Sequence, residues 1–345
     1  MKTIFHKCQC SFIPSPVLEN LAKAGIQPAR LSMQQSKLSR DKRAVKDVDM
    51  KVFAGIAPTG QGPRKLYDSE NTWTQRLTLV REEGGPATPD QAGTKAYDFG
   101  GAVRDYFKVV LDRNSIDNLG MDIILNVHFG VDYMNAFWDG DEMTFGDGDG
   151  AIFTNFAKSL DVVAHELSHG VTQFTSNLDY YSQSGALNEH FSDVFGSVIT
   201  QHNNHQDAGS ADWLIGDEIM GPTLFGEALR SMRSPGTAYD NTLMGKDPQP
   251  DHMSNYYSGP ADNQGVHINS GIPNKAFFLA AMAIGTDKAA QIWYHALQSL
   301  WPTADFNDAA TVIANSARVL TNSGEAPAGS TQVVRSAFKA VGLPI

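Results

Sequence analysis

Residues 159–174 read SLDVVAHELSHGVTQF, and this stretch decides how the second half of the chain folds. Its apolar residues recur at steps of three and four, the spacing of one buried stripe on a helix. The stripe consists of Leu160, Val163, Ala164, Leu167, Val171 and Phe174. A second stripe predicts another helix and consists of Leu187, Phe191, Val194, Phe195, Val198 and Ile199. We therefore expect two buried helices and a mostly helical C-terminal part.

The first of these helices contains His165-Glu166-Leu167-Ser168-His169, with two histidines four residues apart. Residues four apart lie on one face of a helix, about 40° and one turn from each other, so both rings can reach one metal ion at about 2.0–2.1 Å. Glu166 lies about 100° further round the helix, where it can address a water on that ion. This spacing is a zinc metalloprotease motif. The alternative interpretation is a pair of exposed histidines on a helix surface.

A third zinc ligand is available on the second helix. A catalytic zinc ion needs three protein ligands and an open position for water. Glu189 and Asp193 are four residues apart and therefore share one face. Glu189 can complete a set of two His and one Glu, and Asp193 can accept the free ring N–H of a ligand histidine. The alternative is a solvated acidic face, but nearby small residues favour close helix packing, namely Gly185, Ala186 and Gly196.

The overall composition excludes several classes of protein. The 345 residues are 41% hydrophobic, which is enough for more than one core. The net charge of −11 argues against nucleic acid or an anionic membrane as the main partner, and no apolar run approaches the roughly 18–20 residues of a membrane-spanning helix. Cys8 and Cys10 are the only cysteines, so disulfides do not build the fold. The first twelve residues lack the apolar stretch of a secretory signal, so we expect synthesis in the cytoplasm.

The first 50 residues differ from the rest of the chain. After Pro14 and Pro16, helical spacing predicts a short helix that includes Val17, Leu18, Leu21, Ala22 and Ile26. Residues 30–51 hold seven basic and three acidic residues and no Gly, Pro or aromatic residue. This part is either a solvated helix or linker, or a removable pro-segment with basic sites at Arg40, Lys42 and Arg43. The two cysteines are either ordinary reduced thiols or a thiolate cap for the zinc ion of a precursor.

Between residues 51 and about 155 the patterns predict a mixed region with many strands. Residues 74–81 alternate, residues 121–129 carry a β-branched run, and residues 94–111 have helical spacing. Asp139-Gly140 after apolar residues predicts a hairpin turn. Residues 145–150 (FGDGDG) resemble a calcium loop only in composition, because the closing Glu is absent, so we expect a tight turn. Further helices are expected at residues 273–284, 287–300, 305–320 and 330–341.

Together these motifs resemble the thermolysin-like zinc endopeptidases. Asn135-Ala136-Phe137-Trp138 and the stretch DNQGVHINSG at residues 262–271 match as well, and the resemblance runs from about residue 64 to the C-terminus. The N-terminal segment is similar to the short propeptide of the protealysin subgroup. The resemblance implies an α+β fold with a strand-rich N-terminal lobe, a helical C-terminal lobe and the zinc helix between them. It implies a propeptide at residues 1–50, an N-terminal catalytic lobe with the zinc helix at 51–182, and a C-terminal catalytic lobe at 183–345.

The resemblance also implies roles for individual residues. His165, His169 and Glu189 would bind one Zn²⁺, and Glu166 would be the general base that takes a proton from zinc-bound water. The oxyanion would be stabilised by Tyr180 and His267, with Asp262 orienting His267. The substrate peptide would be held in extended form by Asn135, the Ala136 backbone and Arg230. The pocket for the residue that follows the cleaved bond would be lined by Phe153, Phe156, Val162, Ile215 and Leu229.

The acidic residues near the cleft depart from the family pattern. Asp161, Asp212 and Asp217 match a paired-calcium site, but Thr200 and Leu214 stand where carboxylates are usual. Because hard cations need several oxygen ligands, we expect one Ca²⁺ at most.

The expected function is zinc-dependent hydrolysis of peptide bonds on the amino side of bulky hydrophobic residues, by a monomer that is made as an autoprocessed precursor. Its partners would be peptide and protein substrates and its own propeptide, which would inhibit it, with no nucleic acid and no membrane. Family habit implies secretion, and the alternatives are cytoplasmic accumulation or non-standard export. Two other functions stay open: a binding module with a structural zinc ion, and an exopeptidase that uses the same zinc helix.

Overall fold

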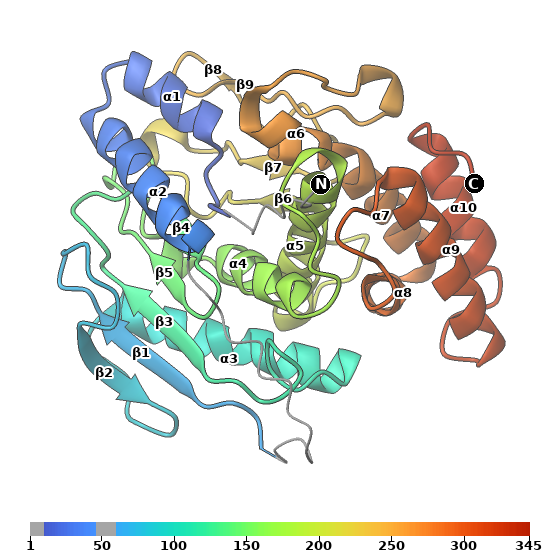
Figure 1. Ribbon diagram of the computed structural model, residues 1–345, viewed down its shortest axis with the longest axis horizontal. Helices are drawn as coiled ribbons and strands as arrows, with labels where there is room; N and C mark the ends of the chain where they lie inside the picture. The colour runs from blue at the N-terminus through green and yellow to red at the C-terminus, as the bar shows by residue number, and fades with distance from the viewer. Residues whose placement is uncertain (1–9, 46–59) are drawn as a thin grey trace.

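A computed structural model describes residues 10–45 and 60–345 of the chain. A strand-rich lobe holds the five-stranded sheet, and a helical lobe follows it (Figure 1). Helix α4 (Leu160–Gln173) lies between them, because it packs against strand β4 (Ala136–Trp138), helix α3 (Gln91–Leu111) and helix α5 (Ser182–Asn203). The α+β, two-lobe prediction is confirmed.

The five-stranded sheet has the order β2-β1-β3-β5-β4. Strands β1 (Arg64–Asp68), β3 (Ile123–Val127) and β5 (Met143–Phe145) run parallel, whereas β2 (Thr78–Glu82) and β4 are antiparallel to their neighbours. Strands β4 and β5 form the hairpin predicted from Asp139-Gly140, and Gly140 has the positive φ of 116° that a turn glycine tolerates. Strand β4 is an edge strand and faces the functional site, so its backbone can pair with another extended chain.

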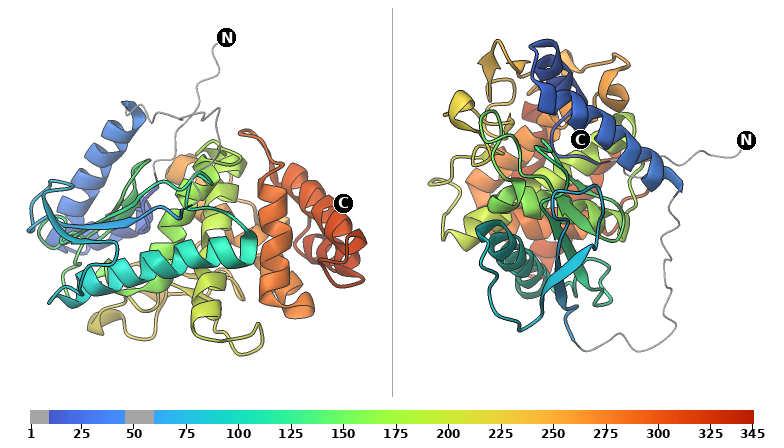
Figure 2. Two further views of the ribbon diagram at one scale, coloured as in Figure 1. Left: turned by 90° about the horizontal axis from the view of Figure 1, so that it is seen from below. Right: turned by 90° about the vertical axis from the view of Figure 1, so that its left-hand side faces the viewer.

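Helix α3 covers one face of this sheet (Figure 2). The side chain of Asp90 caps its N-terminus by accepting the Gly93 amide. Gly100 fits against the sheet because an added Cβ would lie 3.0 Å from Leu125 Cδ1. The close packing of this helix holds the sheet at a fixed distance from α4.

Helices α4 and α5 form the centre of the molecule. Every residue of α4 is buried, and so is most of α5. The apolar stripes correctly predicted both helices, but they did not predict that the polar faces are buried too. Gly196 lets the two helices approach, since an added Cβ would lie 3.1 Å from the Asp161 carbonyl oxygen.

The remaining elements complete the helical lobe and the lower side of the cleft. Two small antiparallel pairs are formed by β6 (Leu214–Ile215) with β7 (Arg230–Ser231) and β8 (Asp240–Asn241) with β9 (Gly245–Lys246). The four helices expected after residue 273 are confirmed as α7 (Gly271–Ile284), α8 (Thr286–Leu297), α9 (Phe306–Asn322) and α10 (Ser330–Ala340). Short helix α6 (Ala261–Asn269) precedes α7. The single 3₁₀ turns η1 (Phe156–Lys158), η2 (Pro222–Leu224) and η3 (Met253–Asn255) precede α4, β7 and α6, respectively.

Two N-terminal helices, α1 and α2, pack against each other and lie beside strands β4 and β5 (Figure 1). Helix α1 (Ser15–Lys23) starts with a proline in its first turn, as predicted, and buries Val17, Leu18 and Leu21. Helix α2 (Gln27–Val45) is long and has no strongly apolar face.

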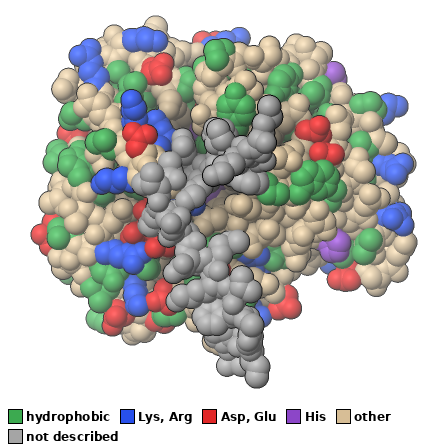
Figure 3. Space-filling model, in the orientation of Figure 1, with side chains coloured by type: hydrophobic (Ala, Val, Ile, Leu, Met, Phe, Trp, Pro, Cys, Tyr) green, Lys and Arg blue, Asp and Glu red, His purple; other side chains and the backbone are tan. Residues whose placement is uncertain are grey.

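The surface view in Figure 3 shows acidic and basic side chains interspersed on this face, outside the residues drawn in grey. Within residues 10–45 and 60–345, no helix combines the length and the hydropathy needed to cross a bilayer.

Candidate active site

Three buried side chains bring their acceptor atoms together between α4 and α5. The Nε2 atoms of His165 and His169 are 3.1 Å apart, and the Glu189 carboxylate oxygens lie 3.4 Å and 3.5 Å from them. Ligands at about 2.0–2.1 Å in a tetrahedron are about 3.3 Å from one another, so these separations suit one zinc ion. Glu189 Oε2 is buried and has no hydrogen-bond partner among the described residues. A shared cation would satisfy this oxygen.

Neighbouring polar groups fix both histidine rings in the orientation that a metal needs. Asp193 Oδ1 accepts from His165 Nδ1 at 2.9 Å, and Asn188 Oδ1 accepts from His169 Nδ1 at 2.7 Å. Each ring therefore turns the lone pair of Nε2 toward the other. Burial lowers the pKa of His165, but the hydrogen bond to Asp193 and the negative charges of Asp193 and Glu189 outweigh it and raise the pKa to about 9. Burial lowers the pKa of His169 to about 4.

Asp193 is the hub of a buried network. Besides His165 it accepts from Arg230 Nε at 2.9 Å, from Arg230 Nη2 at 2.9 Å and from Asn274 Nδ2 at 2.8 Å. Burial raises the pKa of Asp193, but the charge of Arg230 and the bond to His165 hold it well below its usual range. Asp193 therefore stays ionised beside the histidine.

Glu166 is held with one oxygen occupied and one available. The Trp138 backbone N–H donates to Glu166 Oε2 at 2.9 Å, while Oε1 is buried and has no partner among the described residues. Burial, with a further contribution from the charge of Glu189, raises the pKa of Glu166 to about 8. Glu166 converges with His165 and His169, their ligand atoms all lying within 4.8 Å of one another.

The opposite wall of the site consists of Tyr180 and His267. Tyr180 Oη donates to Glu189 Oε1 and lies 3.3 Å from His267 Nε2. Asp262 accepts from His267 Nδ1 at 2.7 Å and from the His267 backbone N–H at 2.8 Å. This contact depends on four consecutive residues with positive φ, from Asp262 to Gly265, which turn the carboxylate back toward the ring. Such a left-handed run is unusual outside functional sites.

Two family models match nearly the whole chain. The model for the thermolysin metallopeptidase catalytic domain matches residues 29–173, and the model for its alpha-helical domain matches residues 176–343. The chain belongs to the thermolysin metallopeptidase family. It is therefore a thermolysin-like metallopeptidase, and the His165-Glu166-His169 cluster fits the zinc site of that family.

Individual relatives agree with this membership of the thermolysin family. The "Extracellular metalloprotease" of Pectobacterium carotovorum subsp. carotovorum is 45% identical over 302 residues, which is 86% of this chain and 87% of that protein. "Protease PrtS" of Photorhabdus sp. (strain Az29) is 48% identical over 239 residues, or 68% of this chain and 64% of its own length. The solved precursor of protealysin, a metalloproteinase from Serratia proteamaculans, has a TM-score of 0.85 and 40% identity. It covers 97% of this chain and 99% of that chain, so the likeness includes helices α1 and α2.

The structure buries the predicted pocket residues together but does not bring the predicted calcium ligands together as a metal-binding group. All five pocket residues are buried in the main core, namely Phe153, Phe156, Val162, Ile215 and Leu229. The three acids Asp161, Asp212 and Asp217 do not converge as a metal-binding group in the described part of the chain. The amides of Gly216 and Val162 and the Ser159 hydroxyl already donate to Asp161. Burial and the charges of Asp161 and Asp212 raise the pKa of Asp217 to about 7.

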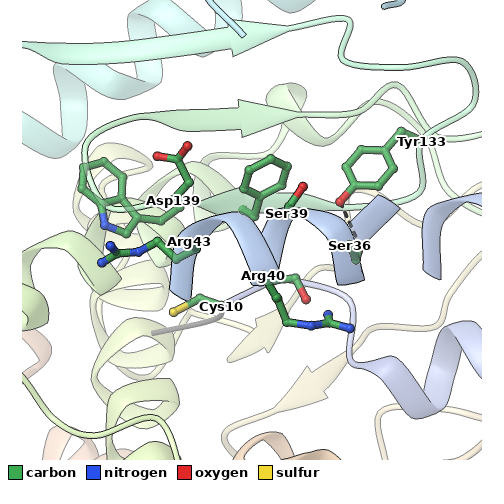
Figure 4. Close-up of a pocket in the computed structure, with 10 residues that line it drawn as sticks. Cys10, Ser36, Ser39, Arg40, Arg43, Tyr133 and Asp139 are labelled. Atoms are coloured by element: carbon green, nitrogen blue, oxygen red, sulfur yellow. Dashed lines mark hydrogen bonds between the residues drawn. The ribbon is translucent and has the colours of Figure 1, made fainter. Parts of the chain in front are cut away.

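The N-terminal segment covers this site. Figure 4 shows Ser36 of α2 bonded to Tyr133, and Arg43 pointing toward the same pocket as Asp139 and Cys10. Arg43 Nη2 donates to Gln173 Oε1 at 2.8 Å. Cys10 is disulfide-bonded, so it is neither the reduced thiol that was expected nor a thiolate that could cap the metal ion. Cys8 lies outside the described residues.

Sequence reasoning missed several residues that shape the site. Asn188, Ser192 and Asn274 bind the ring of His169 or the carboxylate of Asp193, and Phe12 and Ile13 occupy the cleft. Helical spacing could have indicated Asn188 and Ser192, because they flank Glu189 on the same helix. Nothing in the local sequence links Asn274 or Phe12 to residues more than 80 positions away.

Proposed function

We propose that the chain is a zinc-dependent endopeptidase that hydrolyses peptide bonds on the amino side of bulky hydrophobic residues. The observation that carries this proposal is the meeting of the His165, His169 and Glu189 acceptor atoms at 3.1–3.5 Å, beside the unpartnered Glu166 oxygen. Two His and one Glu are the ligand set of catalytic zinc, whereas closed structural sites use four ligands and usually cysteine.

His165, His169 and Glu189 would hold the ion, with Asp193 and Asn188 keeping the rings in place. When bound, zinc supplies Lewis acidity that makes a water molecule acidic and polarises a peptide carbonyl. Glu166 would accept the proton of the attacking water at Oε1 and pass it to the leaving amine, while the Trp138 amide keeps the carboxylate from turning.

The negative charge that forms on the substrate oxygen would be met by donors from Tyr180 and His267. Each such donor typically lowers the barrier by about 3–4 kcal/mol. Asp262 would keep the His267 ring oriented through its 2.7 Å bond. The substrate backbone would be held by Asn135, by the Ala136 carbonyl and by the buried Arg230 Nη1, which has no partner among the described residues.

The N-terminal segment supports the proposed specificity. The Phe12 side chain is fully buried, and its ring lies 5.2 Å from the His165 ring. An aromatic side chain therefore already fits the apolar pocket beside the zinc ligands. Such pockets discriminate weakly between similar apolar side chains, about 1–3 kcal/mol per methylene, so Leu, Phe, Ile and Val should all be accepted.

We infer further that residues 1–50 are an inhibitory propeptide removed by self-cleavage between Arg40 and Lys51, leaving catalytic lobes at 51–182 and 183–345. The name of the Pectobacterium relative and the precursor state of the Serratia neighbour support a secreted, autoprocessed enzyme. The mature enzyme would be a monomer that binds one calcium ion at most.

The proposed function is tested by measuring metal content and peptide cleavage on the same protein. Elemental analysis of the purified protein should give one zinc per chain, and a furylacryloyl-peptide substrate should be cleaved by the mature form and not after chelation. Product mapping on a long peptide should show internal cuts, because removal of single terminal residues would indicate an exopeptidase. The Glu166→Ala precursor should keep its original N-terminus, and normal processing of this variant would reject self-cleavage.

A further inference from the structure

Residues 10–13 cross the active site from one wall to the other. Cys10 packs with Tyr180 and Val266 on the oxyanion side. Two residues later, the Phe12 ring lies 5.2 Å from the His165 ring, and the Arg230 guanidinium carbon is 5.2 Å from its centroid. The peptide between these two side chains therefore passes the metal-binding atoms.

The backbone of this segment is paired in one defined direction. The Phe12 N–H donates to the Ala136 carbonyl at 3.0 Å, and the Ile13 N–H donates to Asn135 Oδ1 at 2.8 Å. Asn135 Nδ2 donates in turn to the Ile13 carbonyl at 3.3 Å. Main-chain pairing with an edge strand is how extended peptides are bound without regard to their side chains. These bonds fix which residue faces the pocket and which bond faces the zinc ligands.

The Phe12 side chain is fully enclosed. It has no exposed surface, and it lies in the main hydrophobic core together with the five predicted pocket residues. A Cβ added to Gly216 would lie 3.0 Å from Phe12 Cε1 and 2.9 Å from Leu229 Cδ1. The pocket is thus occupied by a side chain of the class proposed for the substrate residue that follows the cleaved bond.

We propose that the Ser11–Phe12 peptide bond is a self-cleavage site of the precursor, separate from the maturation boundary between Arg40 and Lys51. The proposal rests on the proposed peptidase function. Hydrolysis adds one water across the bond: the Ser11 carbonyl carbon gains the hydroxyl and becomes a carboxylate, and the Phe12 nitrogen leaves as an amine and takes up a proton. The segment would then be a slowly cut substrate rather than a permanent plug.

The structure also explains why this bond is selected over other bonds that precede apolar residues. Val17, Leu18 and Leu21 lie within helix α1 and face the protein core. A helical backbone cannot lie extended along strand β4, so these bonds are protected while α1 is folded. Residues 10–13 precede the helix, and Phe12 and Ile13 already pair with Ala136 and Asn135.

The test follows the termini of the full-length precursor after zinc is added. Intact-mass and N-terminal analysis should detect a chain that begins at Phe12, forming at a rate that does not change on tenfold dilution, because the cut is made within one molecule. Phe12→Ala should slow this cut at least 100-fold, and Phe12→Leu should restore it. Leu38→Ala on α2 is the matched control, because Leu38 is 54% exposed, and it should leave the rate unchanged.

A second measurement does not depend on turnover. A synthetic peptide of residues 8–17 should raise the melting temperature of mature Glu166→Gln protein, and the Phe12→Ala peptide should not. The proposal is overturned if a precursor that matures fully and cleaves furylacryloyl peptides keeps the Ser11–Phe12 bond intact. A precursor that cleaves no peptide at all would instead reject the proposed function.

Discussion

Helices α4 and α5 and helices α1 and α2 both lie against the active site, but different contacts hold them there. All of α4 is buried, and its polar side chains are tied into a charged network that centres on Asp193. Helix α2 buries Ala29, Ser32, Ser36 and Arg43, and its other described side chains are exposed or partly exposed.

These contacts distinguish a part that would stay in the mature enzyme from a part that would leave in the proposed maturation. Removing a member of the network around Asp193 would leave a buried charge without its partner. The network is therefore costly to break. The N-terminal segment instead uses mostly neutral hydrogen bonds, with Arg43 as a charged donor, and buried apolar side chains such as Phe12 and Leu21. Neutral hydrogen bonds contribute about 0.5–1.5 kcal/mol each, and water can replace them when the segment dissociates.

The largest effect should come from the proposed base, in the part that would stay. Glu166→Gln keeps the size and the Trp138 hydrogen bond but cannot accept a proton, so kcat should fall by about 10²–10⁴-fold. Zinc content measured on the same sample should be unchanged. Glu325→Gln, at an exposed position, is the control and should keep full activity. Retained turnover in Glu166→Gln would assign the base to another residue.

The second-largest effect should come from breaking the charged network around Asp193. Asp193→Ala leaves the Arg230 guanidinium buried without its partner, which should reduce the free energy of unfolding by about 3–5 kcal/mol. It also releases the His165 ring and should weaken zinc binding by about 10–100-fold. Urea denaturation and a chelator competition titration measure the two effects. Equal zinc affinity in Asp193→Ala and wild type would show that the carboxylate does not orient the ring.

A smaller effect is expected where α2 meets the sheet lobe. Ser32 Oγ accepts the Met134 backbone N–H at 2.8 Å in a buried contact. Ser32→Ala leaves this amide unpaired and should weaken docking of the segment by about 1–3 kcal/mol. Limited proteolysis of the precursor should show faster cleavage within residues 27–45. Ser39→Ala, on the same helix but partly exposed, should digest like wild type.

A site remote from both helix pairs should give the smallest effect. The bond to Asp147, with burial opposing it and Asp90 adding to it, raises the pKa of His128 to about 9. Because the folded pKa is above the unfolded value of about 6.5, this stabilisation is complete below about pH 6.5 and is lost as pH rises through about 9.

His128 is partly exposed, so we expect a change of about 1 kcal/mol in the free energy of unfolding between pH 6.5 and 9.5. The measurement is thermal unfolding of wild type and His128→Gln across this range. The difference between the two proteins should shrink as pH rises, and a constant difference would contradict the assignment.

Several elements could be predicted because their signals are local. The helical stripe at residues 160–174, the Asp139-Gly140 turn and the two prolines before α1 all depend on neighbours within a few positions. The proposed zinc ligands on α4 could be predicted for the same reason, since a spacing of four in a helix places two rings together wherever the helix lies.

Other features depend on residues that are far apart in sequence. The burial of the polar face of α4 arises because α3, α5 and β4 enclose it, and no periodicity within α4 reports on those neighbours. Asn274 reaches Asp193 across 81 positions, and Phe12 reaches the zinc ligands from another part of the chain altogether. The acids Asp161, Asp212 and Asp217 show the reverse. The family resemblance suggested a reduced calcium site there, whereas in the structure backbone amides already donate to Asp161.

The amino-acid sequence by itself determined the helices, the metal-binding spacing on α4 and the membership of a hydrolytic zinc family, because short-range periodicity and ligand chemistry need only adjacent residues. Tertiary structure alone decided which carboxylate stays ionised, which oxygen of Glu166 is available, and which peptide of the N-terminal segment lies beside the zinc ligands. Those outcomes depend on burial and on distances between segments, and both exist only once the chain has packed.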